Sequence, residues 1–446
     1  MFENKLFSKS DIWALFLPLI AEQFLAYLVG LLDSVMVSSA GEAAVSAVSL
    51  VDSISVLMIT IFSSLAAGGA VVIGQYLGMK NNAKARSAAE QLFVILGILS
   101  VAITAVLLIF KAQIIKLLFG SAESAVINNC NTYYHIVMFS IPFIALYNGG
   151  AALFRTLGNS RIPFRVSIIM NLINVVGNAI LIYVFKIGVA GVAIPTLVSR
   201  AAAMVIILSL VLKKDFPLTL AHMSEYKYDA VISKNIFSIG IPNSIEGGMF
   251  QFGKIALLSL VSTLPTYSIT ANAIGNTVAS LHCVIGMAAN LTLISIASRC
   301  VGANDYDQAR FYTRYMIKLT YILQGIFCVI LILLIPATCK IYGVSGITAT
   351  QATQILLLHA IPTILIWPLA FMLNTTMRAA GDSKFAMWIA MISMWVFRVS
   401  LSYILILGFK QSVVCIWICW SIDWLFRISV FLPRYLGHKW EDKAIE

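Results

Sequence analysis

Long apolar stretches, separated by short polar or Gly- and Pro-containing segments, fill most of this 446-residue chain. Each stretch is at least as long as the roughly 20 residues that an α-helix needs to cross a bilayer. Because backbone groups in lipid must be hydrogen-bonded internally, such stretches indicate membrane-spanning helices. Dividing the chain at its polar, Gly and Pro clusters predicts twelve spans: 11–38, 47–78, 88–110, 126–155, 163–186, 190–213, 231–262, 268–301, 309–337, 350–379, 385–408 and 412–436.

Composition supports this reading. Hydrophobic residues make up 60% of the chain and charged residues only 11%, against about 25% charged in soluble proteins. The apolar runs are continuous and do not alternate, which argues against an outer-membrane barrel. The first run is also too long for a cleavable signal peptide. The predicted fold class is therefore an all-α polytopic membrane protein with twelve transmembrane helices.

The distribution of Lys and Arg predicts the orientation. The loops after even-numbered spans are richer in cations than the loops after odd-numbered spans, so both termini are expected on the cytoplasmic side of the cell (inner or plasma) membrane. The net charge of +11 then reflects cytoplasmic loops, and no nucleic-acid partner is expected. The cations after even-numbered spans are Lys80, Lys84, Arg86, Arg161, Lys213, Lys214, Lys227, Arg310 and Lys384.

Three motifs of the first half recur in order in the second half. "PLIAE" from Pro18 matches "PNSIE" from Pro242 (242 − 18 = 224), "VIGQYLGMKNNAKAR" matches "IASRCVGANDYDQAR" at the same offset, and "FRTLGNSR" matches "MRAAGDSK" at 223. With six spans per half, both repeats enter the membrane from the same side, so they are expected to be parallel. The predicted division is a lobe at 1–212, a cytoplasmic linker at 213–230 and a lobe with a short tail at 231–446.

Two carboxylates lie in the first span, and acids within a membrane helix are a functional hypothesis because their burial is unfavourable. Glu22 and Asp33 are eleven residues apart (33 − 22 = 11), which places them on about the same helix face, roughly 16 Å apart along the axis. Pro18, one turn before Glu22, removes a backbone donor and predicts a bend. The alternative is that Glu22 caps a solvated vestibule and Asp33 lies at the outer water interface.

The duplication separates these two acids. Glu22 is repeated as Glu246, whereas the position equivalent to Asp33 is Leu257. Asp33 is therefore the candidate for a task that only one half performs. The same half contains Asn and Thr residues whose oxygens, together with a carboxylate, suit a hard cation or an exchangeable proton; ordinary interhelical hydrogen bonding is the alternative. These candidate cation-coupling residues are Asn148, Asn174, Asn178 and Thr196.

The second half offers different polar groups. Glu246, Gln251 and Lys254 lie in the seventh span. Together with Glu22, these residues are candidates for gating or substrate contact. Snorkelling towards the outer interface is the simpler explanation for Lys254.

Arg398 and Asp423 fall at similar depth in the last two spans, because helix rise brings them to the same level from opposite directions. We expect them to form a structural ion pair, for which Arg427, at i+4 from Asp423, could compete. Asp52, near the start of the second span, is expected to be solvated.

Enzymatic motifs are missing. "GQYLGMKNNAKAR" lacks the G-K-[ST] of a phosphate-binding loop, and neither the seven cysteines nor the five histidines show metal-site spacing. We therefore expect no cofactor and no enzymatic activity.

The quoted motifs resemble those of the multidrug and toxic compound extrusion (MATE) family of cation-coupled antiporters. The resemblance covers nearly the whole chain and also includes "LFRTLGNSRIPF", "NLINVVGN", "GVAIPT" and "GIPNSIEGGMFQFGK". It implies a V-shaped, two-lobe bundle. It also implies a monomer in the lipid bilayer that exports amphipathic, often cationic, small molecules, xenobiotics among them, against an inward flow of Na⁺ or H⁺.

The resemblance also implies roles for particular residues. The family's cation residues fall on Asp33, Asn148, Asn174 and Thr196, and Asp33 and Asn174 would be metal ligands if Na⁺ is the coupling ion. Asn178 stands where many bacterial members have an aspartate. The acid pair that some members have in the second lobe is missing here, since Phe250 replaces one acid and the tenth span has none. A carrier that flips lipid-linked precursors, or an integral membrane enzyme, are the alternative functions.

Overall fold

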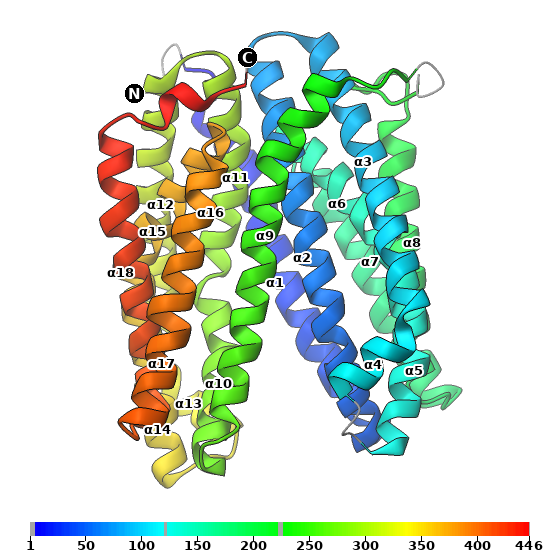
Figure 1. Cartoon of the computed structure of the whole chain (residues 1–446), viewed down its shortest axis with the longest axis vertical. Coiled ribbons are helices and arrows are strands. Elements are labelled where there is room, and N and C mark those ends of the chain that lie inside the picture. The colour runs from blue at the N-terminus through cyan, green and yellow to red at the C-terminus, as the bar shows by residue number, and fades with distance from the viewer. Residues whose placement is uncertain (1–4, 120–122, 222–225, 446) are drawn as a thin grey trace. The chain divides into compact units, whose positions relative to one another are not determined.

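The computed structural model describes residues 5–119, 123–221 and 226–445, and every regular element in these residues is a helix (Figure 1). Among them, ten helices are long and apolar enough to cross a membrane, and a bent pair makes eleven. The one predicted span that this test does not include is the seventh, 231–262, which corresponds to α9 (Ala230–Val261) and contains Lys234, Glu246 and Lys254. The prediction of an all-α polytopic membrane protein is confirmed.

The helices pack into two compact units, Trp13–Ser244 and Met1–Ile12 with Ile245–Glu446, called here the N-terminal and C-terminal units. The boundary at Ser244 lies inside α9, so the first half of α9 belongs to the N-terminal unit. The start of α1 (Lys9–Ser38) likewise belongs to the C-terminal unit. The units defined by helix packing therefore differ from the lobes expected from the sequence repeat. The lobe limits 1–212 and 231–446 stay a prediction.

The N-terminal unit is built around α2 (Glu42–Gly78), which packs against several other helices. Small residues allow these helices to approach closely. A Cβ atom on Gly150 would meet the Ile207 side chain, and one on Gly68 would meet the backbone of Gly240 in α9. The remaining helices of the unit are α3 (Asn82–Ile109), α4 (Lys111–Phe119), α5 (Ser124–Phe139), α6 (Ile141–Thr156), α7 (Arg161–Ala179) with a π-helical extension Ile180–Val184, and α8 (Ala190–Val211).

The C-terminal unit contains α14 (Gly346–Leu365) at its centre, packed against α10 (Thr266–His282), α12 (Tyr306–Leu333) and α18 (Val414–Leu436). Figure 1 shows α18 in red beside α16 (Ser383–Ile392) in orange. The other elements are α11 (Val284–Gly302), α13 (Ile335–Ile341), α15 (Trp367–Ala379), the π-helical segments Ser393–Ser400 and Ile404–Gly408 on either side of α17 (Leu401–Tyr403), and a short turn of helix at Glu441–Lys443.

Four predicted spans are each made of two helices. The break in 126–155 lies at Ser140 and the break in 350–379 at Ile366, where α14 and α15 bend by 51°. In both cases a proline, Pro142 or Pro368, occupies the first turn of the following helix. The preceding helix ends there because a proline has no N–H to continue its backbone hydrogen bonds. The spans 268–301 and 309–337 break at Cys283 and Leu334.

The duplication is also visible in the backbone. Asn81 Oδ1 accepts a hydrogen bond from the Lys84 N–H at 3.0 Å and caps α3, and Asp305 caps α12 in the same way (305 − 81 = 224). The predicted pair of six-span repeats is thereby confirmed in local structure. Left-handed residues recur at the same offset: Lys80 and Asn304 with φ of 58° and 55°, and Lys186 and Lys410 with φ of 52° and 50°.

The predicted linker 213–230 is held against the N-terminal unit by Gln91 of α3, which is fully buried. Its Nε2 donates to the Lys227 carbonyl at 2.8 Å, and its Oε1 accepts from the Tyr226 hydroxyl at 2.6 Å. Residues 222–225 of this linker lie outside the described residues. Its described part therefore packs as a component of the N-terminal unit.

Both ends of the chain meet the start of α12. The Leu6 N–H donates to Gln308 Oε1 at 2.7 Å, and the Tyr312 hydroxyl donates to the Phe7 carbonyl at 2.7 Å. Near the other end of the chain, Glu441 forms an ion pair with Arg310. The two terminal segments therefore lie on the same side of the membrane.

Candidate functional site

A polar network surrounds Asp33 in the N-terminal unit. Asp33 lies near the end of α1, and Asn174 and Asn178 lie one turn apart on α7, buried to 8% and 0% exposure. Asn178 Nδ2 donates to Asp33 Oδ1 at 2.9 Å. Because the i, i+4 spacing places both amides on one helix face, α7 presents them together to the carboxylate.

Asn174 links this carboxylate to α8. In the amide orientation that satisfies both ends, Nδ2 donates to Asp33 Oδ1 and Oδ2 at 3.0 and 3.2 Å, and Oδ1 lies 3.2 Å from the Thr196 hydroxyl as an acceptor. Thr196 follows Pro195 in α8. Four of the five residues proposed for cation coupling are therefore together.

Two polar atoms of the proposed cation-coupling residues have no hydrogen-bond partner among the described residues. Asn178 Oδ1 is buried beside Asp33 without a donor, and the buried Asn148 Nδ2 of α6 has no acceptor. Asn148 makes no hydrogen bond to Asp33 within the described chain. A buried acceptor without a donor is unfavourable, so Asn178 Oδ1 suits a ligand that brings a proton or a positive charge.

Two further charged residues, Asp52 and Arg200, interact with this network, and Arg200 was not nominated from the sequence. Asp52 accepts a hydrogen bond from the Tyr133 hydroxyl at 2.9 Å, and Arg200 Nη1 donates to Ser140 Oγ at 2.7 Å. Asp52 and Arg200 both interact electrostatically with Asp33. Asp52 is partly buried, which corrects the expectation that it is solvated. A cation inside an apolar span is visible in the sequence and marks a functional candidate, so Arg200 could have been predicted from the sequence.

The duplicated glutamates form duplicated ion pairs. Glu22 Oε1 lies 2.6 Å from Arg155 Nη2 in the N-terminal unit, and Glu246 pairs with Arg378 in the C-terminal unit. Each arginine comes from a motif that the sequence had matched separately. The proposed gating or substrate role of the glutamates stays a prediction, and the ion pairs add a structural role.

The C-terminal unit buries one carboxylate between two arginines. Asp423 of α18 forms ion pairs with Arg398 and, at 3.0 Å, with Arg427 Nε, and it accepts a hydrogen bond from the Ser393 hydroxyl. All three charged side chains are at most 3% exposed. The structure therefore brings together Arg398, Asp423 and Arg427. Ser393 starts a π-helical segment, a widened turn that often marks functional positions.

Two cations, Lys254 and the Arg398 that pairs with Asp423, lie near Phe250. The Lys254 ammonium lies 5.1 Å from the centre of the Phe250 ring, and the Arg398 guanidinium lies 5.4 Å from it. Such positions allow cation–π attraction. Lys254 is exposed and Gln251 is partly buried on the same helix. The Phe250 ring therefore lies close to two cations.

A buried histidine pair was not foreseen. Nδ1 of His282 in α10 and Nδ1 of His359 in α14 are 2.9 Å apart, and the two rings stack. One Nδ1 must carry a proton for this hydrogen bond to form. The rings of Trp417, Trp420 and Trp424 each form a T-shaped contact with His359. The two histidines are 77 residues apart in the sequence (359 − 282 = 77), so no local sequence motif predicts their contact.

Comparison with known proteins agrees with the repeat and the fold. The MatE family model matches residues 18–180 and 242–404, two ranges offset by 224 residues (242 − 18). The chain is 26% identical over 414 residues to the probable multidrug resistance protein YoeA of Bacillus subtilis, covering 89% of this chain and 88% of that protein. It is 21% identical to the probable multidrug resistance protein NorM of Thermotoga maritima, covering 98% and 94%.

A solved structure has the same fold. It is that of a MOP superfamily transporter from Pyrococcus furiosus, described as having a binding pocket of reverse polarity that suggests a different function. The TM-score is 0.89 at 18% identity, over 98% of this chain and 97% of that one. Since the family model covers more than half of the chain, in two copies at the offset of its own repeat, the protein belongs to the MATE family of membrane transporters.

Proposed function

We propose that this chain is a secondary active multidrug exporter, which moves amphipathic organic cations outwards in exchange for inward Na⁺ or H⁺. Its relatives include proteins named for multidrug resistance. The observation that carries the proposal is the Asp33 network, in which neutral amides hold a carboxylate and Asn178 Oδ1 has no donor in the described residues.

The network has the chemistry of a site for one small cation. Carboxylate, amide and hydroxyl oxygens are the ligands of hard cations, and a lone carboxylate within a membrane helix also accepts a proton. Asp33, Asp52 and Arg200 together carry a formal charge of −1 when all are ionised. One monovalent ion, or one singly charged organic cation, would neutralise this group.

The exchange follows from competition for that charge. An ion that enters from outside neutralises Asp33 and weakens its hold on a cationic substrate, which leaves. The neutral site then favours the inward-facing state, since a ligand shifts a conformational equilibrium only by its different affinity for the two states. The empty, ionised carrier changes state slowly, because an unpaired carboxylate in a dry intermediate is unfavourable.

The proposal includes a location. The terminal segments lie on one side of the membrane, and the bias of Lys and Arg makes that side cytoplasmic. The chain would then be a monomer in the cell membrane, with its site reached alternately from either side.

The test is transport in proteoliposomes. Purified protein is reconstituted, a cationic dye is supplied, and Na⁺ and H⁺ gradients are imposed separately, with a neutral and an anionic dye for comparison. We expect the cationic dye to move against at least one imposed ion gradient and to stay at the level of empty liposomes without a gradient. The proposal would be wrong if no dye moved under either gradient. If the protein instead moved a lipid-linked precursor across the bilayer, it would be a flippase.

A further inference from the structure

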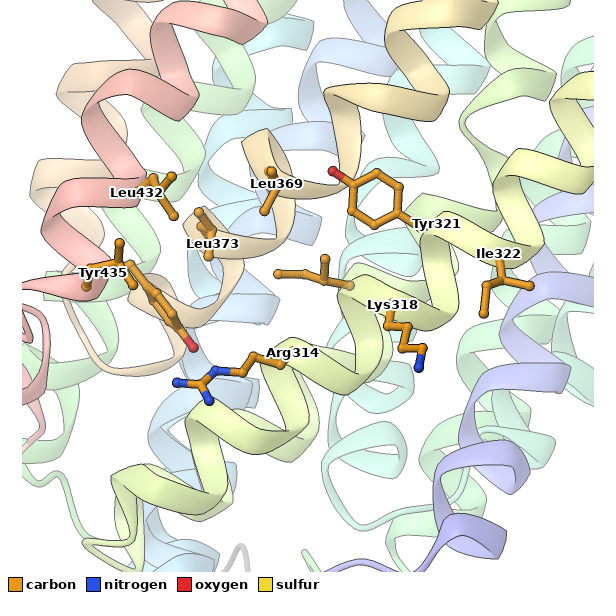
Figure 2. Close-up of a pocket in the computed structure, with 10 residues that line it drawn as sticks. Arg314, Lys318, Tyr321, Ile322, Leu369, Leu373, Leu432 and Tyr435 are labelled. Carbon is orange, nitrogen blue, oxygen red and sulfur yellow. The ribbon is translucent and has the colours of Figure 1, made fainter. Parts of the chain in front are cut away.

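A groove on the C-terminal unit lies between α12, α15 and α18, separate from the network around Asp33 (Figure 2). Its volume is about 400 Å³, within the range of roughly 300–1,000 Å³ typical of ligand sites. Leu369 and Leu373 of α15 line it, together with Leu432 and Leu436 of α18. Most of the groove is therefore apolar.

Two cations stand at one edge of this groove. Arg314 and Lys318 are one helical turn apart on α12, so they share a helix face, and both are exposed. Figure 2 shows both side chains leaving neighbouring turns of α12, with the Arg314 guanidinium directed towards the Tyr435 hydroxyl. The groove thus joins an apolar channel to a positively charged edge.

These two positive charges lack a carboxylate partner within the described residues. Three of the acids at this end of the unit pair with other arginines: Asp307 and Glu441 with Arg310, and Asp382 with Arg434. Because both cations are exposed and neither has a carboxylate partner in the described part of the chain, an anion from outside the chain can reach them.

The surroundings define what kind of anion fits. Ile322 and Leu436 at the rim are 49% and 61% exposed, and in a bilayer they would face acyl chains. Arg314 is eight residues from the start of α12 (314 − 306 = 8), about 12 Å along the axis, a depth at which a long basic side chain reaches the headgroup region. A ligand with an anionic head and an apolar tail matches both parts of the groove.

We propose that this groove holds one anionic phospholipid, with its phosphate against Arg314 and Lys318 and an acyl chain along Leu369 and Leu373. Basic pockets between membrane helices bind lipid headgroups through this combination of contacts. The two cations would repel the organic cations proposed as transport substrates. Assignment to the cytoplasmic leaflet rests on the proposed orientation, whereas lipid binding itself does not depend on the proposed function.

The site belongs to one repeat only. At the offset of 224, the positions equivalent to Arg314 and Lys318 are Glu90 and Val94, which would not attract a phosphate. We therefore expect one such lipid per chain.

The experiment is native mass spectrometry of the full-length protein, released from detergent and titrated with dioleoyl phosphatidylglycerol or dioleoyl phosphatidylcholine. We expect the first phosphatidylglycerol to bind about tenfold more tightly than phosphatidylcholine. The double variant Arg314→Gln/Lys318→Gln should lose this preference. The control Lys213→Gln/Lys214→Gln removes the same charge from an exposed position of the N-terminal unit and should keep it.

Several results would overturn the proposal. They are an equal affinity of the wild-type protein for both lipids, an unchanged preference in Arg314→Gln/Lys318→Gln, or an equal loss in the control. Tight binding of dihexanoyl phosphatidylglycerol or inorganic phosphate would show a soluble-anion site without a role for the apolar groove. A dimer that disappears in the groove variant would show that a second copy is the occupant. Thermal unfolding without added lipid, equal for the two variants, would exclude misfolding as the cause.

Discussion

The acidic residues of the membrane helices differ in their ion-pair and hydrogen-bond partners. Glu22, Glu246 and Asp423 each pair with an arginine. Asp33 instead accepts hydrogen bonds from neutral amides, and it forms no ion pair in the described part of the chain. A carboxylate held by fixed cations has little affinity left for a mobile one. The lack of a fixed ion-pair partner supports the proposed role of Asp33 in binding a transported cation.

Replacing Asp33 with Asn should remove ion-driven transport and leave the fold intact, because the new amide has the same shape and can still hydrogen-bond Asn174 and Asn178. Dye transport under an imposed ion gradient should fall to the level of empty liposomes, with thermal unfolding close to the wild-type value. The control is Asp215→Asn, which removes an acid from an exposed loop. Wild-type transport rates in Asp33→Asn would rule out its coupling role.

The buried arginines of the C-terminal unit make an asymmetric prediction. Asp423→Asn leaves Arg398 and Arg427 without a counter-charge, and removal of one partner from a buried pair costs about 3–5 kcal/mol. Arg398→Met leaves Asp423 paired with Arg427, so its loss of unfolding free energy should be smaller. The double variant should lose less than the sum of the two single variants. Denaturant unfolding in detergent measures these differences, and strictly additive losses would contradict the coupling of Asp423 to Arg398.

At the scale of elements, the twelve spans could be predicted because lipid imposes long, internally hydrogen-bonded apolar helices. The breaks at Ser140 and Ile366 were not predicted. A proline such as Pro142 is compatible both with a kink and with the first turn of a new helix, and packing decides between them. The short helices α4 and α13 were also missed, since their few residues were assigned to loops or to a neighbouring span.

Contacts between helices were harder to predict from the sequence than the helices themselves. Repetition of Glu22 and of Arg155 could be seen in the sequence, but their pairing could not, because it joins helices 133 residues apart. The set of Asp33, Asn174, Asn178 and Thr196 could be nominated, since each is a polar interruption of an apolar helix. Its hydrogen bonds depend on helix rotation and register, which neither hydropathy nor the repeat specifies.

Close packing of α2 against the first half of α9 gives a test at this scale. Gly68→Ala places a Cβ atom against the backbone of Gly240, which cannot move aside as a flexible side chain would. Overpacking of this kind costs about 1–3 kcal/mol, so the unfolding temperature should fall. Gly97→Ala is the matched control, because no atom lies within 4 Å of its Cβ position. Its better helix propensity should leave stability equal or raised by up to about 1 kcal/mol. Equal behaviour of the two variants would show that the helices tolerate a wider spacing.

For the whole molecule, the proposed exchange predicts competition between ion and substrate at equilibrium. Raising the concentration of the coupling ion should weaken binding of a cationic dye to the wild-type protein, because both neutralise Asp33. Dye binding to Asp33→Asn should be weaker and insensitive to the ion. Fluorescence titration at several Na⁺ concentrations and pH values measures this. If dye affinity is unchanged at saturating Na⁺ and at low pH in the wild type, coupling must run through another site.

The membership of α1 and α9 in the two units has a consequence for the origin of the chain. The first residues of α1 pack with the unit formed by the second repeat, and the first half of α9, Ala230–Ser244, packs with the unit formed by the first repeat. A half-length ancestor with one such repeat would have passed its leading segment to a second copy. Such reciprocal exchange of an identical element is a domain-swapped dimer. Gene fusion would then have joined two subunits that already depended on each other, and each modern unit would still contain a leading segment of the opposite repeat.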